Sequence, residues 1–213
     1  MKTVHMAVYD TFSDWELGHA TAHINRAMWQ REPGTWQVRT VGPTSDPVVS
    51  AGGVRVVPDL SLDRLAPGES AMLLLPGADT WETGALAGFG RKAREFLAAG
   101  VPVAAICGAT FGLAAEGLLD DRPHTSNDPN YLAMSGYSGA EQYVPESAVT
   151  DGDLITATGT KPVDFARAVL ARLGVYEPHV LDAWYALYGR NEAEGFYALA
   201  EYESGRAPES VAP

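Results

Sequence analysis

Cysteine is almost absent from this sequence, since Cys107 is the only one among 213 residues. A single cysteine excludes an intrachain disulfide and any zinc site built from several cysteines. Cationic side chains are also few: 15 Lys and Arg stand against 27 Asp and Glu, a formal net charge of -12. No Lys/Arg cluster is present, so a phosphate backbone would be repelled and nucleic acid is not expected as a partner.

Long apolar runs are missing as well. None approaches the roughly 20 residues that a membrane-spanning helix needs, so no membrane association is expected. The opening residues MKTVHMAVYD hold Lys2, His5 and Asp10 within a short apolar stretch, which is unlike a secretory signal. We therefore expect a cytoplasmic protein. The glycine patterns GxGxxG and GxxxxGK are absent too, so no phosphate-binding loop and no cofactor are predicted.

Short apolar runs alternate with segments of helical periodicity along the chain. The runs predict strands at 4–9, 36–41, 54–57, 71–75, 101–106 and 153–157, and the periodic segments predict helices at 14–30, 88–99, 108–116 and 162–173. Near-continuous apolar strands alternating with helices are typical of a parallel sheet covered on both faces. We predict an α/β fold of the flavodoxin-like kind, with an open, mostly parallel sheet sandwiched by helices.

No linker divides the chain. We expect one domain over residues 1–203, in which 176–203 form a C-terminal helical extension rich in aromatic residues. The polar residues 204–213 are predicted to be a flexible tail.

Cys107 lies between an apolar strand and a helix, in the segment VPVAAICGATFGLAAEGLL. A residue between a strand end and a helix start is forced into a tight turn that exposes its side chain above the sheet, as in a nucleophile elbow. The N–H groups and positive dipole of the helix N-terminus favour a thiolate and could hold an oxyanion. The alternative is that Cys107 is an inert buried thiol; the edge of the sheet where ligands bind favours a functional one.

Four segments carry a resemblance to a known family: VYDTFSDWE, LLLPGAD, VPVAAICGATFGLAAEGLLDDR and LITATGTKPVDFARAVL. In order and spacing they resemble the ThiJ/PfpI family of the class I glutamine-amidotransferase-like superfamily, over roughly residues 2–175. The resemblance implies that Cys107 is the nucleophile, that Glu16 from the first helix touches its sulfur, and that the backbone N–H groups of Gly108 and Ala78 form an oxyanion hole. It also implies a homodimer. Because one fold hosts many chemistries, it is stronger evidence for fold than for activity.

Glu16 has a second interpretation. Ser13-x-x-Glu16 fits a helix capping box, in which Glu16 would reach back to the Ser13 backbone N–H. If Glu16 instead lies beside the sulfur, its pKa is expected to be raised, so that it stays protonated and donates a hydrogen bond.

The sequence departs from the family pattern after the cysteine helix. Many relatives have a histidine about twenty residues after the cysteine, and in RPHTSNDP the alignment places Asn127 there. Asn127 can orient a substrate but cannot take a proton. His124 could replace the missing base only if the loop bends back; otherwise it is an exposed loop histidine. The amidotransferase triad is also absent, because Leu181 stands where a glutamate would follow His179.

Other residues are candidates for a substrate pocket above Cys107. Gly77, Trp81 and Tyr131 could wall it together with His124 and Asn127, and pockets are mostly apolar with a few polar groups. Equally, Tyr131, Tyr137 and Tyr143 could be loop anchors. Glu16, His19 and His23 share one helix face, but an interface or groove is favoured there and no metal site is predicted.

Two functions follow from these features. The first is an enzyme in which the Cys107 thiolate attacks a small electrophile, as a hydrolase, lyase or hydratase of the amidase/peptidase, glyoxalase/deglycase or isonitrile hydratase kind. The second is a non-enzymatic stress sensor that responds through oxidation of Cys107. The substrate is not specified by the sequence.

Overall fold

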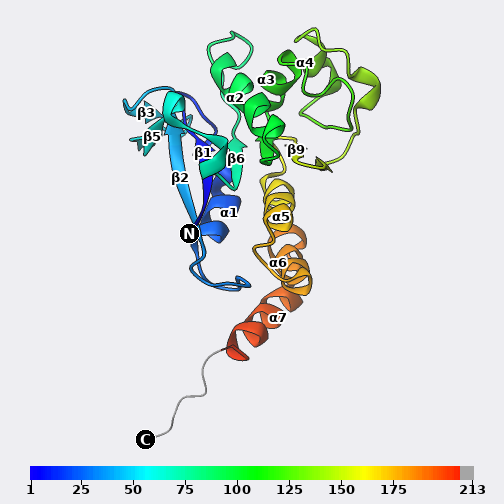
Figure 1. The fold of residues 1–213 in the computed structure, drawn as a ribbon. Helices are drawn as coiled ribbons and strands as arrows, with labels where there is room; N and C mark the ends of the chain where they lie inside the picture. The colour runs from blue at the N-terminus through cyan, green and yellow to red at the C-terminus, as the bar shows by residue number, and fades with distance from the viewer. Residues whose placement is uncertain (207–213) are drawn as a thin grey trace, which may run out of the picture.

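The central element is a seven-stranded sheet. In the computed structural model, which describes residues 1–206, the strand order is β5-β2-β1-β6-β7-β9-β8 (Figure 1). The strands are β1 Lys2–Ala7, β2 Trp36–Gly42, β5 Leu60–Ser61, β6 Met72–Leu75, β7 Val103–Ile106, β8 Ala148–Asp151 and β9 Leu154–Ala157. All neighbours pair in parallel except β8 with β9. The predicted mostly parallel α/β fold is therefore confirmed.

Helices cover the two faces of this sheet. The first face carries α1 Asp14–Asn25, α5 Pro162–Leu173, α6 Pro178–Arg190 and α7 Ala193–Ser204, and in Figure 1 α7 is the lowest of these helices. The other carries α2 Ala87–Ala98, α3 Ala109–Ala115 and α4 Pro129–Ala133. Short 3-10 helices lie at Leu62–Arg64, Pro67–Glu69 and Ala140–Gln142, and a separate antiparallel pair joins β3 Val48–Val49 to β4 Arg55–Val56.

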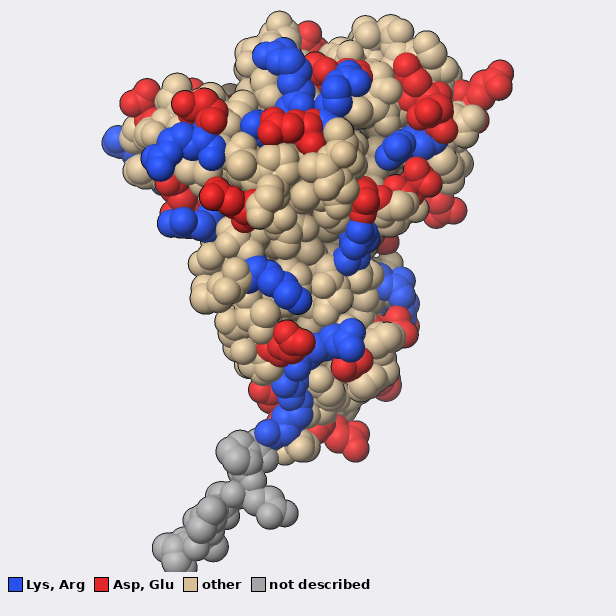
Figure 2. All heavy atoms as spheres, viewed as in Figure 1, with Lys and Arg blue, Asp and Glu red and all other residues tan. Residues whose placement is uncertain are grey.

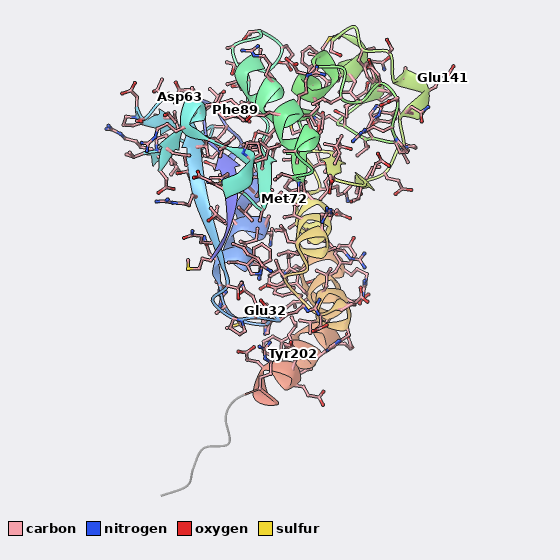
Figure 3. The ribbon with its side chains drawn as sticks, viewed as in Figure 1. Glu32, Asp63, Met72, Phe89, Glu141 and Tyr202 are labelled. Atoms are coloured by element: carbon pink, nitrogen blue, oxygen red, sulfur yellow. The ribbon has the colours of Figure 1, made fainter. Side chains whose placement is uncertain are left out.

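The fully apolar strands are explained by the two cores. Side chains alternate between the faces of a strand, and in β6 the buried Met72 and Leu74 pack on the α1 and α5 side while Leu73 and Leu75 pack on the α2 side. Figure 3 labels one residue of each core, Met72 and Phe89, whereas Glu141 projects outward from the edge of the molecule. Because both faces are covered, every position of this strand can be apolar.

One predicted helix boundary was wrong. The first helix ends at Asn25 rather than at residue 30, because the buried Gln30 side chain turns back and donates to the carbonyls of His23 and Ile24. The C-terminal helical segment consists of two helices, separated where Asn191 adopts a left-handed conformation with φ 56°. The predicted tail begins inside α7 at Ser204, and its residues 207–213 lie outside the described part.

Charge on the visible surface is mixed. Figure 2 shows Lys and Arg interspersed with Asp and Glu over this face. No helix among the described residues has the length and apolar character to cross a membrane.

Candidate active site around Cys107

Cys107 occupies a strained corner between β7 and α3. Its φ is 59°, in the left-handed region that residues other than glycine seldom adopt. Hydrogen bonds fix the backbone on both sides: the Cys107 N–H donates to Ala157 O at 2.9 Å, and the Thr110 hydroxyl donates to Cys107 O at 2.6 Å. The side chain is half-buried. The strand-to-helix corner predicted from the sequence is thus present.

Glu16 is fully buried and held by the loop that follows β6. The Gly77 N–H donates to Glu16 Oε2 at 2.6 Å, and the Ser13 N–H donates to Gly77 O at 2.9 Å. The capping-box interpretation is therefore wrong, because the Ser13 N–H is used by Gly77. The other carboxylate oxygen, Oε1, has no hydrogen-bond partner among the residues that the structure describes.

Two glycines enclose the sulfur and this free oxygen. A Cβ built on Gly159 would lie 2.7 Å from Cys107 Sγ and 3.0 Å from Glu16 Oε1, and one built on Gly77 would lie 2.9 Å and 3.1 Å from the same atoms. Real Cβ atoms essentially never approach so closely. Both positions therefore require glycine, and Sγ and Oε1 share the narrow space between them. Gly77 supports the pair, and it does not form a wall of a substrate pocket.

Asn127 lies beside the sulfur, as the alignment on Thr125 and Ser126 predicts. Its Oδ1 accepts the Gly159 N–H at 2.8 Å and the Thr158 hydroxyl at 3.4 Å. These donors orient the amide so that Nδ2 donates to Cys107 Sγ at 3.2 Å. A neutral donor thus stands where a histidine base was expected.

Burial shifts the pKa values of both groups of the pair upward. Burial raises the pKa of Glu16 to about 7, against the hydrogen bond from Gly77, as expected for a carboxyl in this position. Burial and the negative charge of Glu16 also raise the pKa of the Cys107 thiol, although Asn127 and the Gly108 N–H lower it. Desolvation and the charge of Glu16 therefore act against the thiolate that the helix N-terminus favours.

The two backbone donors assigned to the oxyanion hole lie close together. A Cβ built on Gly108 would be 3.4 Å from Ala78 N. Within residues 1–206, neither the Ala78 nor the Gly108 N–H donates to a backbone carbonyl. Both are therefore available to bind an anion, and the Gly108 N–H lowers the pKa of the neighbouring Cys107 thiol.

His124 and Trp81, which were predicted to line the pocket, lie elsewhere. His124 is fully buried, with Nδ1 against Arg122 O at 2.9 Å and Nε2 against the Tyr137 hydroxyl at 3.2 Å. It therefore cannot replace the missing base, nor is it an exposed loop histidine. Trp81 is buried and donates to Pro76 O.

The tyrosines of this region are loop anchors rather than a pocket roof. The rings of Tyr137 and Tyr143 lie 5.4 and 5.9 Å from that of His124. Tyr131 contacts the corner through Gly108 O at 3.5 Å and packs against Phe111, but its side chain does not line the cavity at Cys107.

The cavity that opens at the sulfur has a volume of about 550 Å³. Its lining comes from α1, the corner, the Asn127 loop and the segment between β9 and α5: Trp15, Glu16, Cys107, Asn127, Thr158, Gly159, Thr160 and Pro162. Sequence reasoning missed the segment after β9. The signal was available, because β9 pairs in parallel with β7 and the carboxyl ends of parallel neighbours meet at one sheet edge.

The remaining histidines have structural surroundings. His23 Nδ1 is hydrogen-bonded to the Tyr176 hydroxyl at 3.0 Å and the ring is stacked on Trp29, so His23 is packed inside the protein rather than lining a groove. His19 is half-buried against Trp184 and Tyr188. In the described part of the chain, no three His, Cys, Asp or Glu side chains are grouped to hold a metal ion.

Comparison with known proteins identifies the family of the chain. A sequence model of the DJ-1/PfpI family matches residues 2–172. The chain is 38% identical to "Uncharacterized protease YoaZ" of Bacillus subtilis over 201 residues, 93% of this chain and 96% of that protein. A ThiJ/PfpI family protein from Bacillus anthracis superposes with a TM-score of 0.90 at 36% identity, covering 95% of this chain and 98% of the other. A DJ-1 superfamily protein from Agrobacterium tumefaciens gives 0.75 at 33% identity, covering 87% and 98%. The chain belongs to the DJ-1/PfpI family.

Proposed function

We propose that this protein is a cysteine-dependent hydrolase that acts on a small electrophilic substrate, with Glu16 as the base that its Cys107 requires. The observation that carries the proposal is the unpartnered Glu16 Oε1 beside the sulfur. A carboxyl whose pKa is about 7 suits proton transfer near neutral pH, since the best catalytic base has a pKa close to the operating pH. Glu16 would thus do the work of the absent histidine.

The proposed reaction has two stages. In the first, Cys107 Sγ forms a bond to the electrophilic carbon while its proton passes to Glu16 Oε1, and the carbonyl π electrons move to the substrate oxygen. The Gly108 and Ala78 N–H groups hold the resulting oxyanion. The oxyanion collapses, the leaving group departs with the proton from Glu16, and a thioester remains. In the second, Glu16 takes a proton from a water molecule whose oxygen bonds to the thioester carbon. The C–S bond then breaks, the acid product leaves, and Glu16 returns its proton to Cys107 Sγ.

The size of the cavity supports a small substrate. At about 550 Å³ it falls in the range of small-molecule sites. Two Bacillus subtilis relatives carry the name "uncharacterized protease", which favours hydrolysis of an amide bond. A lyase or a hydratase would use the same Cys107 nucleophile. Its reaction would differ from hydrolysis in the group that leaves the substrate or in the addition of water.

Turnover by substituted proteins tests the proposal. A panel of small amides, thioesters and 2-oxoaldehydes would be assayed with the wild type, Cys107→Ser and Glu16→Gln. We expect a covalent adduct on Cys107 by intact-mass spectrometry, and loss of turnover in Cys107→Ser with an unchanged circular dichroism spectrum. Turnover that survives Cys107→Ser would overturn the proposal.

A redox sensor is the second candidate, and the neutral Asn127 favours it. The Asn127 amide donates to the sulfur and the Gly108 N–H lowers the pKa of the thiol; both groups would also hold the oxygens of a sulfinate. In that case mild peroxide should add two oxygens to Cys107 before any methionine is oxidised. A thiol that stays reduced while exposed Met134 is oxidised would eliminate the sensor.

The proposal also includes a homodimer and a cytoplasmic location. Support for the dimer comes from exposed apolar residues around the β3–β4 pair, where Val49, Val54 and Val57 are 46%, 55% and 66% exposed. Large exposed apolar patches mark interaction surfaces. Light scattering coupled to gel filtration tests the dimer, and a monomer mass would exclude it.

A further inference from the structure

The lining of the Cys107 cavity carries negative charge and no positive charge. Of its eight residues, Glu16 is the only ionisable group besides the thiol, and none is Lys, Arg or His. Lys161 is adjacent in sequence to this lining, but its side chain is not part of it. An anionic substrate would therefore meet a buried carboxylate at the reacting sulfur and no cation to offset it.

Two apolar side chains, from α1 and α5, line the cavity. Trp15, the second residue of α1, is 56% exposed although it is a large aromatic residue. Pro162, which begins α5, lines the same cavity, and α1 packs against α5. An exposed indole beside a reactive sulfur offers a surface on which a planar apolar group can stack.

Two threonine hydroxyls in the cavity lining are uncharged groups that can form hydrogen bonds. Thr158 and Thr160 line the cavity together with Cys107 and Pro162. The Thr158 hydroxyl donates to Asn127 Oδ1, whereas no hydrogen bond is formed by the Thr160 side chain within the described residues, and Thr160 is exposed. A neutral carbonyl or amide of a substrate could take that hydrogen bond.

We propose that the substrate of this site is an uncharged electrophile with a planar apolar group that stacks on Trp15, and that carboxylates and phosphates are excluded. This inference rests on the proposed function, since it names the substrate class of the same sulfur. It assigns Trp15 as the residue that selects for shape and Glu16 as the one that selects against negative charge.

Two alkylating reagents of nearly equal size test the charge selection. Cys107 would be treated with iodoacetamide, which is neutral, and with iodoacetate, which is anionic; in each the sulfur forms a bond to carbon, iodide leaves, and the thiol proton is lost to Glu16 or water. Because the chain has one cysteine, intact mass reports that residue alone. The same chain unfolded in denaturant gives the intrinsic ratio of the two rates.

The expected result is that folding lowers the iodoacetate-to-iodoacetamide rate ratio by about tenfold or more. The measurement is repeated at high salt, where the Debye length is about 3 Å and the overall charge of the protein is screened. A Thr160→Lys substitution should then raise the iodoacetate rate selectively. Thr150→Lys, on the exposed edge strand β8, adds the same charge away from the cavity and should leave the ratio unchanged.

A second pair of neutral reagents tests Trp15. Iodoacetanilide, which carries a phenyl ring, should react faster than iodoacetamide with the folded wild type, and Trp15→Ala should remove about fivefold of this preference. Val57→Ala, another exposed apolar truncation, should not change it.

The outcomes separate the two proposals. If Cys107 resists every reagent in the folded protein, the nucleophile itself is wrong. If it reacts with both charge types in the intrinsic ratio, or if Trp15→Ala keeps the phenyl preference, the substrate class is wrong while the nucleophile stands.

Discussion

Asn127 directs its side-chain NH2 at the sulfur of Cys107 from 3.2 Å. The orientation of the amide is fixed because the Gly159 N–H donates to its oxygen Oδ1 at 2.8 Å. Asn127 therefore acts only as a donor to Cys107, and it stabilises negative charge on sulfur as a bond to carbon forms. It cannot remove the thiol proton, and that task is left to Glu16.

Substitutions of Asn127 should slow the alkylation of Cys107, and a substitution that adds negative charge should slow it more. Asn127→Leu removes a hydrogen bond to a developing anion, which is worth about 1.5–3 kcal/mol, so alkylation at pH 8 should slow about 10- to 100-fold. Asn127→Asp keeps the shape but points an oxygen at the sulfur, which raises the pKa of Cys107 further, and it should be slower than Asn127→Leu. Rates of iodoacetamide modification check this order.

Asn191→Asp is the matched control for this charge change. Asn191 ends α6 in a left-handed conformation, which aspartate also tolerates. Its alkylation rate should equal that of the wild type. An Asn127→Asp protein as reactive as the control would contradict the donor role.

Gly159→Ala should inactivate the site without unfolding the protein. The added methyl would lie 2.7 Å from Sγ and 3.0 Å from Oε1, so the sulfur and the carboxylate must separate. We expect turnover and alkylation to fall by at least about tenfold, since misplacement of about 1 Å can cost about 100-fold.

Gly18→Ala is the control for adding a methyl group. Gly18 is an exposed position in α1 with nothing within 4 Å of an added Cβ. It should raise the free energy of unfolding by about 0.5–1 kcal/mol and leave reactivity unchanged. If Gly159→Ala reacts like Gly18→Ala, the close approach of sulfur and carboxylate is not required.

The fold followed from sequence because its strands are short, buried on both faces and therefore continuously apolar. The corner at Cys107 followed for the same reason, since strand 101–106 leads directly into a helix. Asn127 was placed correctly by its distance from Cys107 and by the Thr125-Ser126 pair. These features depend on local pattern and spacing.

What could not be predicted depends on where loops cross in space. His124 was a candidate base, yet it is held by Arg122 O and Tyr137, contacts that no spacing reveals. The upward shift of the Cys107 pKa was not foreseen, because burial and the charge of Glu16 are properties of the assembled site. Trp15 and Gly159 were missed since their importance comes only from what they approach.

The free energy of unfolding should depend on pH through two buried groups whose pKa values shift in opposite directions. The pKa of Glu16 is raised from 4.5 to about 7, so its contribution is fully present below pH 4.5 and is lost as the pH rises through 7. Burial lowers the pKa of His23 from 6.5 to about 4, so its contribution is present above pH 6.5 and is lost as the pH falls toward 4. In the wild type the two trends largely cancel.

Single substitutions should expose each trend. Between pH 5 and pH 7.5, the free energy of unfolding of Glu16→Gln should rise by roughly 2 kcal/mol relative to that of the wild type, because the variant has no buried carboxyl to ionise. His23→Gln keeps an acceptor for Tyr176. Its free energy of unfolding relative to that of the wild type should be higher at pH 5 than at pH 7.5. Urea unfolding at the two pH values measures both. Parallel pH curves for all three proteins would show that neither group is perturbed by folding.

The most direct test is the pH profile of iodoacetamide reaction at Cys107 in the wild type and in Glu16→Gln. Coupled groups titrate in separate steps, so the wild-type rate should rise first near pH 7, as Glu16 becomes a base, and again near pH 11, as the thiol ionises. Glu16→Gln should lose the first rise and show a single one below pH 11, because the carboxylate charge that raises the thiol pKa is removed. One rise at the same pH in both proteins would contradict the proposal that Glu16 serves Cys107 as its base.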